Sequence, residues 1–133
     1  MARTRSASPQ GAPEAVEQLQ EMLDGARCEL EAGRRKAAGT LAIAGAVRAV
    51  DLICDTALGR HSTAASHQVA LDLLATVPGA DEAVEHFSVC QTHKSDYNYH
   101  ATEIDSEQVV AVIEAAEALG REAHRRVQDR GWA

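Results

Sequence analysis

The sequence is poor in the residues that build β-sheets and in those that interrupt helices. Only 3% of its 133 residues are aromatic, and it has three prolines. Ala, Leu, Val, Glu and Arg dominate instead, and most of these residues favour helices over strands. The composition therefore predicts an all-α fold, and the length is that of a single ordinary domain.

The cysteines form no pair with the spacing of a metal or redox motif. Cys28, Cys54 and Cys90 lie far apart without any Cys-x-x-Cys, which excludes a zinc knuckle or a dithiol motif of that kind. We expect three reduced thiols.

Long apolar runs are also missing. The basic start of the chain leads into Ser, Pro and Gly, and no stretch approaches the ~20 apolar residues that span a bilayer. We therefore expect a soluble cytoplasmic protein that does not bind a membrane.

Positive charge is in deficit, with a net charge of -7. Nucleic acids are held mainly by neutralising phosphates with Lys and Arg, so this balance opposes nonspecific binding but does not exclude a local basic cleft. Two basic clusters are present, and both are interpreted as solvated faces: Arg34 to Lys36, and Arg121, Arg125, Arg126 and Arg130.

Apolar periodicity predicts one up-and-down bundle of about five helices over residues 13–130, after a disordered arm at residues 1–12. We expect helices at about 13–32, 36–58, 63–77, 81–90 and 106–128, with Asp105 or Ser106 capping the last. The helix at 36–58 is rich in Ala and Gly and should be the most buried. It should pack antiparallel to the helix at 106–128.

Polar residues within the expected helices have two interpretations. Arg48, Asp51 and Asp55 are spaced at three and four residues, which fits either an intrahelical ion pair or the polar wall of a cleft. His67 falls in the first turn of its helix, where an exposed or capping role competes with ligand binding.

A ring-rich segment, residues 93–100, is expected to form a loop. It contains His93, Lys94, both tyrosines of the chain and His100. A cation and an imidazole that stand just before the N-terminus of a capped helix could bind a phosphate group. The histidine could also act as general acid or base. Tyr97 and Tyr99 could stack on bases, or could close the end of the bundle while Lys94 and His100 remain solvated. A metal site is also conceivable but lacks ligand spacing: His93, Asp96 and His100.

Several motifs together resemble a HEPN domain over roughly residues 37–127. They are Gly45 to Leu52 in an Ala-rich helix, Ser66-His67-Gln68 opening the next helix, Lys94-Ser95-Asp96-Tyr97, and a long final Ala-rich helix. The resemblance implies a dimeric helical bundle, which in many members is a metal-independent endoribonuclease or a toxin with an antitoxin partner.

The resemblance also implies the site residues. The nuclease motif of the family is an Arg, a polar residue and then a His, and Lys94, Ser95 and His100 fall on these positions. His100 and Lys94 would be catalytic without a cofactor or metal, and RNA or a nucleotide would contact Lys94, Ser95, Asp96, Tyr97 and Tyr99. Lys in place of Arg loses the two-pronged contact with phosphate. A non-catalytic dimeric binding or regulatory module is the alternative.

The homodimer would bring Lys94 and His100 of both copies to one cleft. Small residues could form the flat faces that such a contact needs, or could line the core of the monomer: Ala44, Gly45, Ala111, Ala115 and Ala118.

Overall fold

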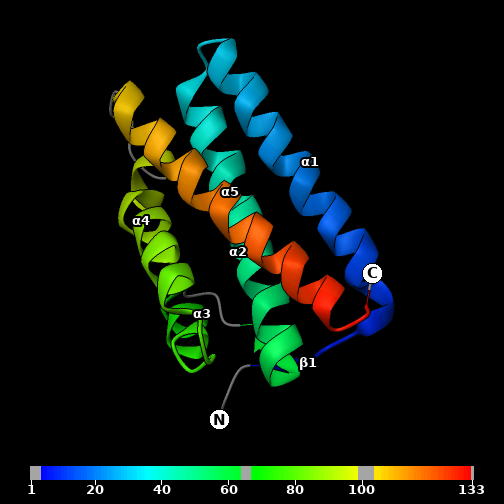
Figure 1. The fold of residues 1–133 in the computed structure, drawn as a ribbon. Coiled ribbons are helices and arrows are strands. Elements are labelled where there is room, and N and C mark those ends of the chain that lie inside the picture. The colour runs from blue at the N-terminus through cyan, green and yellow to red at the C-terminus, as the bar shows by residue number, and fades with distance from the viewer. Residues whose placement is uncertain (1–3, 64–66, 99–103, 133) are drawn as a thin grey trace.

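The computed structural model describes residues 4–63, 67–98 and 104–132, without the side chains of residues 95, 96 and 98. Within this part of the chain there are five α-helices, namely α1 Ala12–Glu31, α2 Arg35–Leu58, α3 His67–Leu74, α4 Asp81–Asn98 and α5 Ser106–Asp129. Figure 1 shows the four long helices packed as a bundle, with the short α3 at one end. The prediction of a mainly helical fold is confirmed.

A small sheet at the N-terminus was not predicted. Strand β1 Thr4–Ser6 pairs antiparallel with β2 Arg60–Ser62, and a 3-10 turn at Pro9–Gly11 leads into α1. The Ala7 amide also donates to the Gly59 carbonyl at 2.8 Å. Residues 4–12 therefore differ from the disordered arm expected for residues 1–12. Strands that pair through backbone hydrogen bonds need no periodic pattern of apolar side chains, so no such pattern marks these residues in the sequence. Residues 1–3 lie outside the described part.

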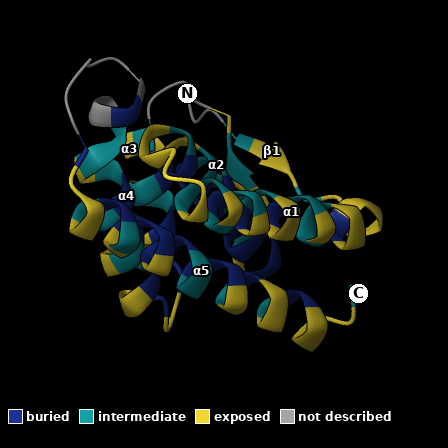
Figure 2. Cartoon of the chain, turned by 90° about the horizontal axis from the view of Figure 1, so that it is seen from above, coloured by how far each residue is buried: buried dark blue, intermediate teal, exposed yellow. Residues whose placement is uncertain are grey.

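Helix α2 is the central helix, as predicted. Most of its small residues are buried against α1, α4 and α5, and Figure 2 shows the exposed residues on the outer sides of the helices. A side-chain carbon at Gly45 would lie 3.0 Å from Leu23 Cδ2 of α1. Gly45 and Ala115 are both buried, so these two small residues belong to the core of the monomer.

The predicted antiparallel arrangement of the core pair is wrong, because α2 and α5 run in the same general direction (Figure 1). Arg35 at the start of α2 donates to the carbonyl of Ile104, just before α5, at 3.1 Å. Only one long helix, α4, returns the chain between α2 and α5, since α3 has eight residues. Two successive reversals restore the original direction.

The ends of two helices are fixed by the residues that favour such ends. Gly59 ends α2 with a φ of 76°, a left-handed conformation that glycine adopts without strain. Asp105 caps α5 by accepting a hydrogen bond from the Glu107 amide at 2.7 Å. The predicted cap of the last helix is therefore confirmed.

By length and composition alone, α2 is apolar enough to cross a membrane, contrary to the expectation from the sequence. Its most apolar 18-residue window has a mean hydropathy of 1.6, and 61% of that window is buried inside the bundle. The core helix of a soluble protein meets the same criterion.

Candidate functional site

Most of the segment expected to be a loop at residues 93–100 is helical, which corrects that prediction. Helix α4 continues to Asn98, because Tyr97 extends the buried stripe of Phe87 and Cys90 at helical spacing. Tyr99 and His100 lie outside the described residues, as do the side chains of Ser95 and Asp96.

Tyr97 is a packing residue in this structure. Its side chain is buried against Gly39 of α2, where an added carbon would lie 2.0 Å from Tyr97 Cε1. A ring enclosed in this way is not placed to stack on a base. This position agrees with the interpretation in which a tyrosine closes the end of the bundle.

The charge of Lys94 in α4 acts on His67, which lies at the first position of α3. The pKa of His67 is lowered, first by burial and then by the positive charge of Lys94. The Nδ1 atom of His67 is buried without a hydrogen-bond partner among the described residues. The neighbouring His93 ring instead faces α5, with Nδ1 2.7 Å from Gln108 Nε2.

His67 also lines a groove with a volume of about 500 Å³. One wall is a stripe of α2 at steps of three and four residues, and the other contributions come from α1 and α3. The lining residues are Met22, Thr40, Ile43, Ala44, Val47, Arg48, Asp51 and His67. Hence Arg48 and Asp51 form the polar wall of a cleft, one of the two interpretations from the sequence.

Asp51 is an ionisable group held in an unfavourable environment. The pKa of Asp51 is raised to about 6, mainly by burial and also by the charge of Asp55, while the charges of His61 and Arg48 oppose the shift. Buried carboxylates whose pKa is raised in this way are common at functional sites. Asp51 therefore marks the groove as the best candidate site among the described residues.

We expect Asp51→Asn to stabilise the protein at pH 7.5 by about 3 kcal/mol, because the pKa of Asp51 is raised from 3.8 to about 6 and each pKa unit corresponds to ~1.4 kcal/mol. An unfolded aspartate has a pKa near 3.8, whereas folded Asp51 keeps its proton up to about 6. Between these values the folded state binds more protons, so its stability falls as the pH rises.

Urea denaturation at pH 7.5 and pH 4 measures the effect. The gain from Asp51→Asn should be largest at pH 7.5 and should disappear near pH 4. Asp24→Asn on the exposed side of α1 provides a control for the change in net charge. An equal gain at both pH values would show that the pKa of Asp51 is not raised.

The sequence did not reveal the pairing of Asp55 with His61. Asp55 lies in the last turn of α2, and its Oδ1 is 2.8 Å from Nδ1 of His61 in β2. Burial raises the pKa of Asp55, and the hydrogen bond and charge of His61 oppose that shift. The pair depends on the pairing of β1 with β2, which was not predicted.

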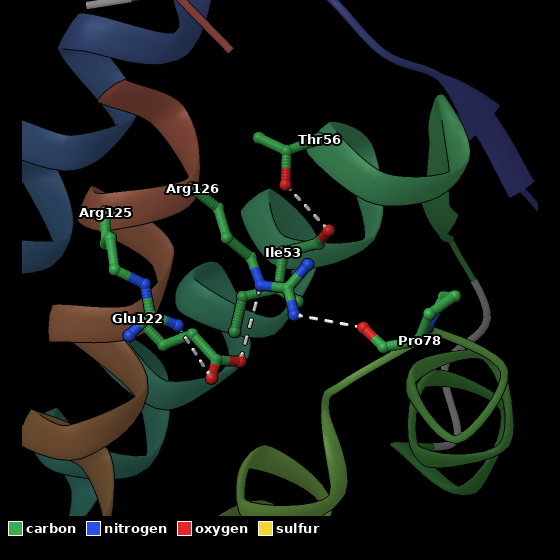
Figure 3. Close-up of polar contacts among 6 residues, drawn as sticks. All are labelled: Ile53, Thr56, Pro78, Glu122, Arg125 and Arg126. Atoms are coloured by element: carbon green, nitrogen blue, oxygen red, sulfur yellow. Dashed lines mark hydrogen bonds and ion pairs between the residues drawn. The ribbon is translucent and has the colours of Figure 1, made fainter. Parts of the chain in front are cut away.

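The late basic cluster is partly structural, as Figure 3 shows. Arg126 points between α5 and the turn after α3, where it donates to the Pro78 carbonyl at 3.4 Å and lies 3.6 Å from Glu122. Arg125 contacts Glu122 at 3.4 Å. In the early cluster, Arg34 pairs with Glu29. Arg126 therefore links α5 to the turn after α3, and Arg34 links the end of α1 to the start of α2, whereas Arg125 pairs only within α5.

No three His, Cys, Asp or Glu side chains gather as metal ligands in the described ranges. The hypothetical metal site cannot be placed, since the side chain of Asp96 and all of His100 lie outside the described part of the structure.

A comparison with protein-family models gives no match, and a comparison with curated proteins gives none either. The HEPN resemblance therefore rests on the motifs quoted above.

Proposed function

We propose that the chain is a cytoplasmic HEPN-type protein that binds RNA or a nucleotide in the groove beside α2. The observation that carries the proposal is the position of two cationic groups, Arg48 and Lys94, around the imidazole of His67, whose lowered pKa leaves it mostly neutral near pH 7. Arg48 of α2 and His67 of α3 line the groove, and the charge of Lys94 of α4 reaches His67. Local groups of this kind bind phosphate even where the net charge is negative.

The enzyme form of this proposal is a metal-independent endoribonuclease. His100 removes the proton from a ribose 2′-hydroxyl, and the resulting oxygen attacks the adjacent phosphorus to form a 2′,3′-cyclic phosphate, while the bond to the 5′-oxygen breaks and that oxygen takes a proton from water. Lys94 stabilises the charge that develops on the phosphate. These roles come from the positions of Lys94 and His100 in the family motif, with Ser95 and Asp96 beside them.

A second candidate is a non-catalytic HEPN dimer that binds a partner or a nucleotide. It is favoured by Lys94 standing where the nuclease motif has Arg, because an ammonium is a point charge without the planar fork of guanidinium. If the first candidate, the nuclease, is a toxin, it also has an antitoxin as its partner. Both candidates require a homodimer, with a mass of twice 14.2 kDa in light scattering.

The two candidates are separated by an RNA cleavage and binding assay in EDTA with single-stranded oligonucleotides. The nuclease should lose roughly 100-fold or more in rate on His100→Ala, since acid–base groups typically contribute that much. Arg48→Gln and Lys94→Gln should each weaken RNA binding by about tenfold, because each removes a charged contact to phosphate.

Arg121→Gln is the matched control, since it removes one exposed positive charge from α5, which does not line the groove. Binding that weakens in the groove variants without any cleavage would support the non-catalytic module. Wild-type protein that neither binds nor cleaves RNA and binds no nucleotide would refute the nuclease and the nucleotide-binding form of the second candidate.

A further inference from the structure

Both termini of the described chain close over the C-terminal end of α2, on a different part of the molecule from the groove. Strand β1 lies beside β2, and Figure 1 shows the C-terminus next to the start of α1. Trp132 is half-buried against the core, with its amide bonded to the Val127 carbonyl at 3.0 Å. These segments line an open cavity of about 220 Å³.

The wall of this cavity contains the Asp55–His61 pair. The side chains of Asp55 and His61 are only 12% and 21% exposed. The 2.8 Å contact uses the Nδ1 atom of His61, so the carboxylate fixes the orientation of the ring and leaves Nε2 as the nitrogen that can contact a ligand. Asp55 already has a partner, which limits its repulsion of an anion.

The other polar groups at the cavity add mainly hydrogen-bond donors. Arg5 pairs with His61 across the two strands, and side chains at opposed positions share one face of a sheet. Ser6 and Ser8 contribute hydroxyls, and Trp132 contributes an apolar surface. A guanidinium, an imidazole and two hydroxyls form a donor set that suits an oxyanion.

We propose that this cavity binds a small oxyanion, the carboxylate or phosphate group of a small molecule, through Arg5, His61 and the two serine hydroxyls. Its volume lies below the range of about 300–1,000 Å³ that is typical of sites for larger ligands. Asp51 is the other carboxylate that interacts with His61, but it lines the groove instead of this cavity. The site is thus distinct from the one proposed for RNA.

Trp132 makes the proposal directly testable, because it is the single tryptophan of the chain and it lines the cavity. Acetate and inorganic phosphate are titrated separately while tryptophan fluorescence is recorded, with sodium chloride at equal ionic strength as the reference. We expect a saturable change with at least one of the two anions. The stronger response identifies carboxylate or phosphate as the preferred group.

Two variants locate the response. Arg5→Gln and His61→Asn should each weaken the fluorescence-detected binding by about tenfold, because each removes one charge-assisted hydrogen bond. Asn can still reach Asp55 with its amide, which preserves the contact at Nδ1, and Arg5→Gln leaves the backbone pairing of β1 intact. Circular dichroism confirms that both variants are folded.

The groove variants Arg48→Gln and Lys94→Gln should leave the fluorescence titration unchanged, so that failure of one site is distinguishable from failure of the other. No saturable change in the wild-type protein beyond that caused by chloride would overturn the proposal. A change that persists in both Arg5→Gln and His61→Asn would overturn it as well.

Discussion

Replacing Gly39 by alanine is expected to destabilise the protein by about 3 kcal/mol, although alanine is normally the better helix residue by ~1 kcal/mol. A side-chain carbon at Gly39 would lie 2.0 Å from Cε1 and 2.4 Å from Cδ1 of the Tyr97 ring. The ring is buried and rigid, so α2 and α4 would have to separate. Thermal unfolding should show a midpoint lower by roughly 10 °C.

Gly25→Ala is the matched control, since Gly25 also lies within a long helix. A carbon added there meets only Leu41 Cδ1, at 3.3 Å, which is the end of a flexible side chain. The control should be neutral or slightly stabilising. Combining Gly39→Ala with Tyr97→Leu should cost less than the sum of the two single changes, because the smaller residue relieves the overlap. An unchanged midpoint for Gly39→Ala would contradict the packing of Tyr97 on α2.

The long helices could be predicted from the sequence because each carries its own apolar period. The expected range 36–58 differs from α2 by one residue at its start, and the expected range 106–128 differs from α5 by one residue at its end. Helix α4 was expected to end near residue 90, because His93, Lys94, Ser95 and Asp96 read as a polar loop. Its continuation buries Tyr97 against Gly39 of α2, a distant contact that the polar residues between Cys90 and Tyr97 do not indicate.

The candidate site shows the same division between local and long-range information. Arg48 and Asp51 could be named as candidates from the sequence because charged residues are unusual on a central helix. Their position beside His67 depends on how α3 packs on α2, and the approach of Lys94 depends on the extension of α4. The sequence therefore indicated some of the participants, whereas only the tertiary structure brings them to one groove.

Truncating the single phenylalanine, by Phe87→Ala, is expected to have the largest effect on stability, a loss of about 4 kcal/mol. Phe87 is fully buried in α4, which packs against α2, α3 and α5. Removing the ring deletes apolar contacts and leaves a cavity that the surrounding helices fill only in part. Small domains are stable by only ~5–15 kcal/mol, so this loss is a large share of the total. Urea denaturation at 25 °C measures it.

Two further variants test whether the loss comes from the core around α4. Phe87→Leu keeps much of the apolar volume and should lose less than half as much as Phe87→Ala. Val69→Ala, at a residue 39% exposed in α3, should change the free energy of unfolding by less than about 0.5 kcal/mol. Equal losses from Phe87→Ala and Val69→Ala would contradict the burial of Phe87.

The His67 ring lies 6.4 Å from that of Phe87, centre to centre, so Phe87→Leu should also loosen His67 and weaken RNA binding in the groove. The position of α3 that brings His67 to the groove depends on the same buried ring.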